Sequence, residues 1–180
     1  MSSEAKISTA LCNGLRELGC YVWKANDART VGIPDIVGVT KSGKHLAVET
    51  KLLKEWPKRE SSGILRNHTI TATQAIHLDE VEARGGLGFI AISFPLPVPA
   101  YWDWNEEIGK QLSGKLGCVL IEWDEWKLSA DDSGGWPTNM KLGPFLALLR
   151  GEAKVPSGCG SMVCTGSMSS AFVPWDWGNL

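Results

Sequence analysis

Three charged residues interrupt two apolar, strand-like runs in the stretch VGIPDIVGVTKSGKHLAVETK: Asp35, Glu49 and Lys51. A charged side chain in a half-buried sheet loses hydration, so each of the three needs an interaction that compensates the loss. Glu49 and Lys51 are two residues apart and therefore point to the same face of a strand. Two carboxylates can hold a divalent cation, and a lysine beside them can stabilise negative charge that develops during a reaction.

The turn between the two runs decides whether the two acids meet. A three-residue hairpin loop that ends in glycine is common, because glycine takes the left-handed conformation without steric cost. If residues 41–43 form this loop, Thr40 pairs with Lys44, and Asp35 falls opposite Glu49 with Cβ atoms ~4.5–5.5 Å apart. Their repulsion then favours a bound divalent cation such as Mg²⁺. The alternative is a surface salt bridge to the neighbouring lysine, in a hairpin whose register is shifted by one residue.

The hairpin needs further elements to position it, and the sequence predicts the order helix, strand, strand, strand, helix, strand. The first helix shows an apolar stripe at Ile7, Leu11, Leu15 and Leu18 and ends at Gly19. The second helix begins with a capping box and ends at a glycine pair. The six predicted elements cover residues 3–18, 20–25, 36–40, 44–52, 71–84 and 88–93.

Pro34-Asp35 followed, after a hairpin, by Glu49-Thr50-Lys51 closely resembles the PD-(D/E)xK nuclease superfamily, and within it the VRR-NUC and archaeal Holliday-junction resolvase groups. The GIPDIVG stretch and a glutamine that opens the following helix add to this resemblance, which covers about half the chain, residues 3–94. It implies an α/β fold with a restriction-endonuclease-like core. Such a core has a helix, a three-stranded antiparallel meander, a helix and a strand in a mixed sheet, and here a C-terminal extension follows it.

The resemblance also implies roles for individual residues. Asp35 and Glu49 would be metal ligands and catalytic residues, together with the backbone carbonyl of Thr50 as a further ligand. Lys51 would be the catalytic lysine. The implied cofactor is Mg²⁺, with Mn²⁺ as a substitute.

Two further residues have both a functional and a structural interpretation. Related nucleases use an acid on the first helix, for which Glu4 is the candidate metal ligand and catalytic residue. An acid in the first turn of a helix is also favoured by the helix dipole alone. In related enzymes a glutamine at the position of Gln74 contacts the site, but Thr71 and Gln74 also form a capping box that explains the glutamine by itself.

Residues 51–66 form the best candidate for a local basic surface, with a possible DNA-binding set at Lys54, Lys58, Arg59 and Arg66. Side chains of this kind hold a nucleic-acid backbone without reading its sequence. A solvated loop explains the same charges equally well. Trp56, in this segment, would wedge against an unpaired or distorted base, or else anchor the loop on the domain.

The 180-residue chain has a globular composition, with 43% hydrophobic and 21% charged residues and a net charge of −2. The N-terminus lacks the pattern of a secretory signal, and no apolar run approaches the ~20 residues of a membrane span. Five cysteines without a regular framework fit a reducing compartment. We therefore expect a soluble, intracellular protein of the cytoplasm, nucleoid or nucleus, from a cell or a virus, that makes no membrane contact.

The proline-rich stretch at residues 95–99 predicts a boundary. We expect a nuclease core over residues 1–94, a C-terminal extension over 95–154, and a mobile Gly-, Ser- and Trp-rich tail over 155–180. Within the extension, the pattern favours a strand and two helices, over residues 118–123, 105–112 and 144–150 respectively.

Together these features favour a magnesium-dependent endonuclease, a hydrolase of DNA phosphodiester bonds. The resemblance implies branched DNA as the substrate, such as a Holliday junction or a flap in recombination, repair or replication, and it implies a homodimer. Two alternatives stay open. One is a catalytically silent nuclease fold that binds DNA or a protein, with the acidic, Trp-rich C-terminal half as the docking region. The other is an RNA endonuclease with the same metal chemistry.

Overall fold

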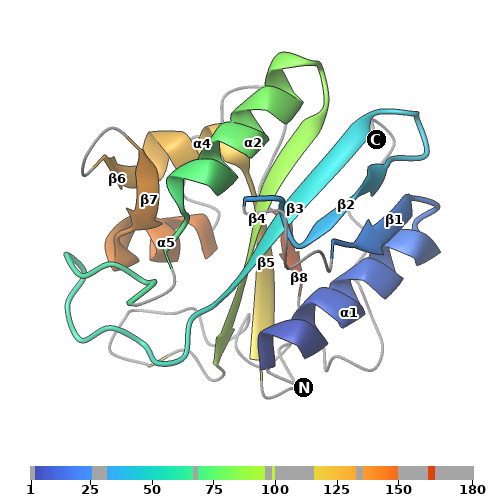
Figure 1. Ribbon diagram of the computed structural model, residues 1–180. Coiled ribbons are helices and arrows are strands. Elements are labelled where there is room, and N and C mark those ends of the chain that lie inside the picture. Colours follow the sequence, from blue (N-terminus) through green and yellow to red (C-terminus); the bar gives the residue numbers. More distant parts are fainter. Residues whose placement is uncertain are drawn as a thin grey trace.

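The computed structural model describes residues 3–25, 32–66, 69–95, 99, 116–132, 136–149 and 162–164. The first half of the chain folds in the predicted order (Figure 1): α1 (Ser3–Glu17), β1 (Tyr21–Lys24), β2 (Ile36–Val39), β3 (His45–Leu52), α2 (Ala72–Ala83) and β4 (Leu87–Pro95). The second half adds β5 (Leu116–Glu122), α4 (Trp123–Ser129), β6 (Ala130–Asp132), β7 (Pro137–Met140), α5 (Leu142–Leu149) and β8 (Met162–Cys164).

The main sheet has six strands in the order β1-β2-β3-β4-β5-β8. β1, β2 and β3 form an antiparallel meander, and β4 then pairs parallel with β3 through the crossover helix α2. β5 and β8 extend the sheet with antiparallel pairings, while β6 and β7 form a separate two-stranded sheet. The predicted α/β fold with a mixed sheet and a restriction-endonuclease-like core is therefore confirmed.

The β2–β3 hairpin has the register that its turn predicts. The ladder runs from Ile36 opposite Val48 to the turn. There, the N–H of Thr40 donates to the carbonyl of Lys44 at 2.8 Å, and Gly43 has a φ of 87°. The left-handed glycine closes the three-residue loop and so fixes which side chains face each other along both strands.

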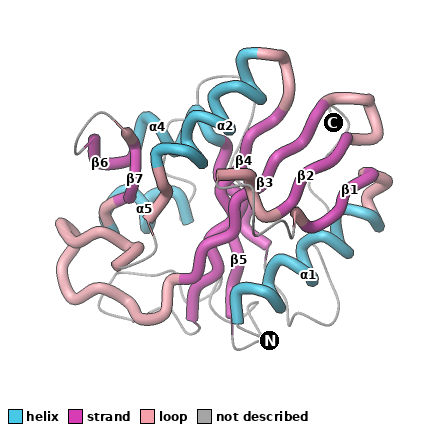
Figure 2. The backbone as a smooth tube through the Cα atoms, in the orientation of Figure 1, coloured by secondary structure: helices cyan, strands magenta, loops and turns pink. Residues whose placement is uncertain are grey.

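Helices cover both faces of the sheet (Figure 2), and an apolar core lies on each face. On one face, α1 packs against β1 and β3, and its buried stripe includes Leu11 and Leu15. On the other face lie α2, α4 and α5, whose core contains Trp123, Trp126 and Phe145. Side chains alternate between these two environments along each strand, so β3 is buried on both faces over most of its length.

The C-terminal extension is part of the same folded unit as the first half. β5 pairs with β4 from Phe89 to Pro95, and α4 and α5 contribute to the core that α2 covers. The predicted strand and the second predicted helix correspond to β5 and α5. The helix expected over residues 105–112 lies outside the described residues, as does the tail from 155 onward apart from β8.

Among the described helices, none combines the length and the apolar character that crossing a bilayer would require.

Candidate active site

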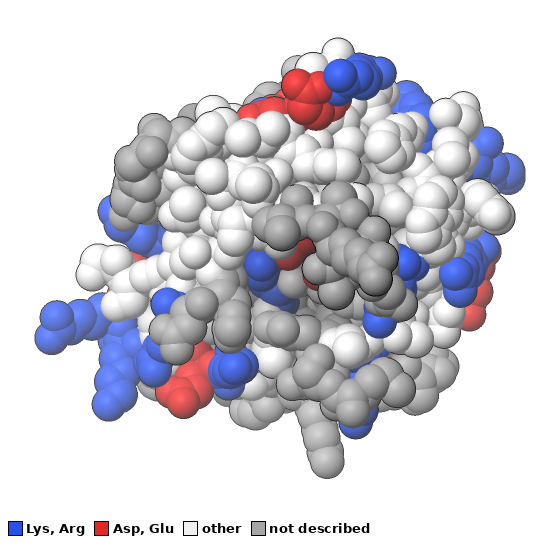
Figure 3. Space-filling view, in the orientation of Figure 1, with Lys and Arg blue, Asp and Glu red and all other residues white. Residues whose placement is uncertain are grey.

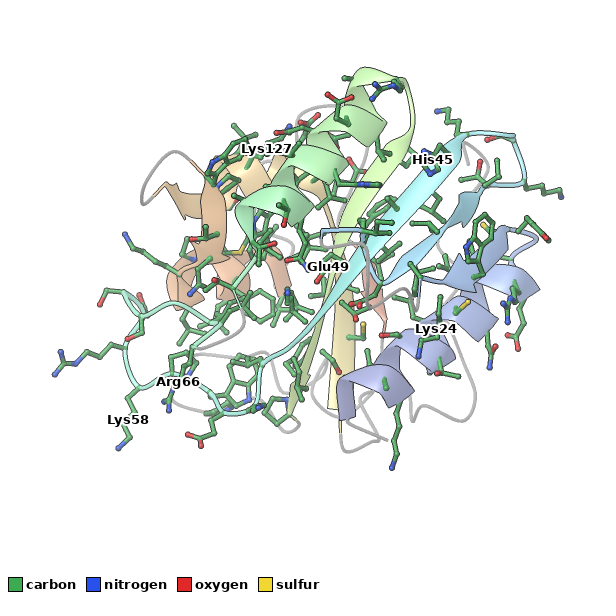
Figure 4. The ribbon with its side chains drawn as sticks, in the orientation of Figure 1. Lys24, His45, Glu49, Lys58, Arg66 and Lys127 are labelled. Carbon is green, nitrogen blue, oxygen red and sulfur yellow. The ribbon has the colours of Figure 1, made fainter. Side chains whose placement is uncertain are left out.

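The candidate site lies where β2 begins, beside the middle of β3 and the first turn of α2 (Figure 4). Continued beyond the β2–β3 ladder, the register places Asp35 opposite Glu49 after one step and Pro34 opposite Thr50 after two. The hairpin and α2 thereby bring together a set of residues predicted from the sequence: Asp35, Glu49, Thr50, Lys51 and Gln74.

Asp35 is held by Thr50 of the neighbouring strand. Its Oδ2 accepts a hydrogen bond from the Thr50 main-chain N–H at 2.9 Å and another from the Thr50 hydroxyl. That hydroxyl lies 2.9 Å from the hydroxyl of Ser8, which is buried on α1. A chain of hydrogen bonds thus runs from α1 through β3 and orients the Asp35 carboxylate at the end of β2.

Glu49 is a buried acid, only 2% exposed. Its Oε1 accepts hydrogen bonds from the Gln74 amide at 2.6 Å and from Lys51 Nζ at 2.9 Å. Its Oε2 is also buried, with no hydrogen-bond partner among the residues that the structure describes. Burial raises the pKa of Glu49 to about 7; the Lys51 charge opposes this shift and the Asp35 charge adds to it. A buried oxygen without a partner is costly, and a bound cation would remove that cost.

Gln74 combines the two roles that its sequence position suggests. As the third helical residue of α2, it completes the capping box: its N–H donates to the Thr71 hydroxyl, and its Oε1 accepts from the Thr71 N–H at 3.0 Å. The other end of the same amide donates to Glu49. The helix cap therefore fixes the amide group that orients the buried acid.

The carbonyl of Thr50 faces the same side as its N–H. In an antiparallel ladder, the N–H and C=O of one residue point to the same neighbouring strand. The N–H of Thr50 meets Asp35, so the carbonyl is directed to the position of Pro34. Proline has no N–H to donate. The Pro-Asp pair therefore leaves this carbonyl without its regular ladder partner, at the place where it was expected as a metal ligand.

The residues present fit a hard divalent cation such as Mg²⁺. Glu49 offers a buried oxygen that no described residue hydrogen-bonds, and Asp35 and the Thr50 carbonyl offer further oxygens. Mg²⁺ needs only one or two carboxylates, because water and phosphate complete its shell. The described part of the chain contains no group of three or more His, Cys, Asp or Glu side chains placed so that they could hold a metal ion together. Glu4 lies on α1, but its side chain is outside the described residues, so its role stays a prediction.

The loop between β3 and α2 carries the predicted basic residues, all exposed: Lys54, Lys58, Arg59 and Arg66. Basic groups gather over this loop in Figure 3, and Figure 4 shows Lys58 and Arg66 projecting from it. Arg66 lies 3.3 Å from Glu55, in a solvent-exposed pair that contributes little. The loop therefore presents positive charge on one side of the site, and its contact with DNA stays a prediction.

Trp56 is packed as an anchor of this loop. Its ring lies against Phe94 and Phe145, with centroid distances of 5.6 Å and 6.3 Å, and its Nε1 donates to the carbonyl of Pro95 at 2.9 Å. A side chain committed to these contacts is not free to wedge between bases. The packing thus favours the structural interpretation of Trp56 over the DNA-binding one.

A second anchor, Asn139 on β7, was not expected from the sequence. Its Oδ1 accepts from the N–H of Leu65 at 3.0 Å, and its Nδ2 donates to the carbonyl of the same residue at 2.6 Å. The N–H of Ile64 donates to the Met140 carbonyl beside it. The C-terminal extension therefore holds the basic loop by hydrogen bonds of the kind that join two strands.

Comparisons with known proteins give a distant likeness to solved structures. No protein-family model matches the chain, and no curated protein does. Among solved structures, Hjc, a Holliday junction resolvase from the archaeal hyperthermophile Archaeoglobus fulgidus, matches with a TM-score of 0.43 and 13% identity, over 78% of this chain and 98% of the resolvase. A likeness of this strength is too low to carry the resolvase's activity over to this chain.

Proposed function

We propose that this protein is a magnesium-dependent endonuclease that hydrolyses phosphodiester bonds of DNA. The observation that carries the proposal is the state of Glu49. It is a buried carboxylate, one of whose oxygens has no hydrogen-bond partner among the residues that the structure describes, and it lies next to Asp35, Lys51 and Gln74. A purely structural ion pair would not leave a buried oxygen unsatisfied at this cost.

Asp35, Glu49 and the Thr50 carbonyl would hold the metal ion, with Glu4 as a further candidate ligand. When bound, the ion would supply Lewis-acid polarisation of a phosphate and a lowered pKa for an attacking water. The protein's own groups would do the rest. The side chain of Lys51 is 10% exposed, and its ammonium group lies 2.9 Å from Glu49. There it would donate to a phosphate oxygen or to the water and stabilise negative charge in the transition state. Gln74 keeps Glu49 in place.

The nucleic-acid backbone would follow the basic loop, where Lys54, Lys58, Arg59 and Arg66 are exposed. We propose branched DNA as the substrate, on the sequence resemblance described above, and a homodimer as the active form, since two strands need two sites. We also propose that the protein acts in DNA recombination, repair or replication.

A cleavage assay tests the proposal. Labelled junction, flap, duplex and single-stranded DNA, and an RNA strand, are incubated with Mg²⁺, Mn²⁺ or EDTA. We expect cutting of DNA that needs the metal, and a loss of at least about 100-fold in Lys51→Ala with binding retained. Arg84→Ala, at the exposed C-terminal end of α2 and ten residues from Gln74, is the matched control and should cut normally. Binding without any metal-dependent cutting would mean a silent nuclease fold, and cutting of RNA alone would mean an RNA endonuclease.

A further inference from the structure

Two large aromatic side chains are exposed on β1, the edge strand of the main sheet. Tyr21 is 76% and Trp23 is 47% exposed, and their rings meet edge to face with centroids 5.7 Å apart. Val22 between them is buried in the core beneath α1. Because side chains alternate along a strand, the two rings lie on the opposite face, which is the face that carries α2.

On that face α2 packs against β3 and β4, while β2 presents half-buried valines. The register sets Tyr21 opposite Val39 and Trp23 opposite Val37. These four side chains form one apolar surface, which we call the aromatic shelf: Tyr21, Trp23, Val37 and Val39.

The aromatic shelf adjoins the candidate active site. Val37 lies opposite Ala47 on β3, two residues before Glu49, so both belong to the same face of the sheet. In the next row of the sheet, the N–H of Ala25 donates to the carbonyl of Asp35 at 2.9 Å, and Asp35 in turn falls opposite Glu49. Two strand spacings and one same-face step separate Trp23 from Glu49, which is about 12 Å.

The surroundings of the aromatic shelf suit a nucleic-acid strand. Lys41 and Lys44, both exposed, lie at the hairpin turn at its end. The basic loop lies beyond the opposite end of β3 (Figure 4), so Glu49 stands between this loop and the lysines at the hairpin turn. A strand held at both ends would cross the site, with aromatic rings on one side of it.

The aromatic shelf is too small for a stable interface with a second copy of the chain. Two aromatic side chains that are 76% and 47% exposed offer roughly 300 Å² at most. A stable protein interface needs about 800 Å² on each partner. Stacking of a few bases needs only the ring faces.

We propose that Tyr21 and Trp23 form a stacking platform for unpaired bases next to the scissile bond. This inference rests on the proposed function and specifies its substrate class: DNA with a single-stranded segment beside the cut, in preference to uninterrupted duplex. Bases inside a duplex are already stacked on each other and cannot reach the rings, whereas unpaired bases can stack on them in any sequence.

The test measures binding by fluorescence anisotropy in EDTA, so that no substrate is cut. The probes are a blunt duplex, the same duplex with a 5′ or a 3′ single-stranded tail, and the tail alone. The double variant Tyr21→Ala/Trp23→Ala should bind tailed and single-stranded probes about ten-fold or more weakly, with binding of the blunt duplex unchanged. Trp23→Phe, which keeps a ring, should retain most of the binding. Leu128→Ala, at another exposed apolar residue, is the matched control.

Equal losses on all probes, or no loss on any, would overturn the stacking platform. A wild-type dimer that the double variant converts to a monomer in sedimentation would also overturn it, by making the aromatic shelf an interface between copies. The proposed function fails separately: selective binding without metal-dependent cleavage keeps the platform and rejects the nuclease. Conversely, metal-dependent cleavage that the double variant preserves equally on every substrate keeps the nuclease and rejects the platform.

Discussion

Thr50 donates two hydrogen bonds, one from its main-chain N–H and one from its hydroxyl, to the same oxygen of Asp35. The register of the hairpin makes this possible, because Thr50 stands opposite Pro34, so its main-chain N–H is directed toward the segment that carries Asp35. The side chain of Asp35 thus accepts the hydrogen bond from the Thr50 N–H. The orientation of Asp35 therefore depends on Thr50 of β3 and, through Ser8, on α1.

The Thr50 hydroxyl can be removed with little change of shape by Thr50→Val. We expect a loss of about 1–2 kcal/mol in the free energy of unfolding, because the Ser8 hydroxyl and the Asp35 carboxylate each lose a hydrogen bond. We also expect about ten-fold slower cleavage, because Asp35 keeps only one of its two bonds from this residue. Thr40→Val is the matched control: Thr40 is another buried threonine whose hydroxyl is hydrogen-bonded, at the far end of the hairpin. It should lose stability but cut at the normal rate, and wild-type cleavage by Thr50→Val would contradict this account.

The two roles of Gln74 can be separated by a pair of variants. Thr71→Ala removes the cap hydroxyl but leaves the amide that contacts Glu49, so about 1 kcal/mol of stability should be lost with cleavage retained. Gln74→Glu keeps an oxygen for the cap but sets a negative charge against Glu49. Cleavage should fall by at least about ten-fold and need more metal. The readouts are thermal unfolding and a metal titration of the cleavage rate, and identical behaviour of the two variants would leave Gln74 as a cap only.

The parts of the fold that local patterns encode were predictable. The stripe of α1, the capping box of α2 and the hairpin turn at Gly43 each involve residues a few positions apart, and the turn alone fixed the register that sets Asp35 opposite Glu49. Contacts between distant segments were not predictable. Asn139 and Leu65 are 74 positions apart, and nothing in either local pattern indicates their pairing. The packing of Trp56 and the link from Ser8 to Thr50 depend in the same way on the assembled core.

The pKa of Glu49 predicts how the stability of the metal-free protein depends on pH. An acid whose pKa rises from 4.5 to about 7 on folding binds a proton more tightly in the folded state. The contribution of Glu49 to the free energy of unfolding is therefore fully present below pH 4.5 and is lost as the pH rises through about 7. Glu49→Gln cannot ionise, so in EDTA it should be more stable than the wild type at pH 8 by up to about 3 kcal/mol, with a smaller difference at pH 5.

Thermal unfolding of the wild type and of Glu49→Gln between pH 5 and pH 8 measures the difference in their stability. The other titrating groups are the same in both proteins, so their contributions cancel. Mg²⁺ or Mn²⁺ added at pH 8 should stabilise the wild type and have much less effect on Glu49→Gln, because the metal binds the ionised acid. A difference between the two proteins that is independent of pH, or equal stabilisation of both by the metal, would contradict the assignment of Glu49 as a buried metal ligand.

Asn139 should control the order of the basic loop from a distance. Asn139→Ala leaves the N–H and the carbonyl of Leu65 without their partners, which should cost about 2–3 kcal/mol of stability. Because Lys58, Arg59 and Arg66 belong to the loop that this residue holds, trypsin should cut there faster in the variant than in the wild type, under conditions where both are folded. Asn13→Ala, an exposed asparagine on α1, is the control and should change neither property.

If the loop is what holds the nucleic-acid backbone, Asn139→Ala should also weaken DNA binding and flatten its salt dependence, since fewer cations are held in place against the phosphates. Unchanged proteolysis of the loop in a destabilised Asn139→Ala protein would show that the hydrogen bonds between Asn139 and Leu65 stabilise the core but do not order the basic loop.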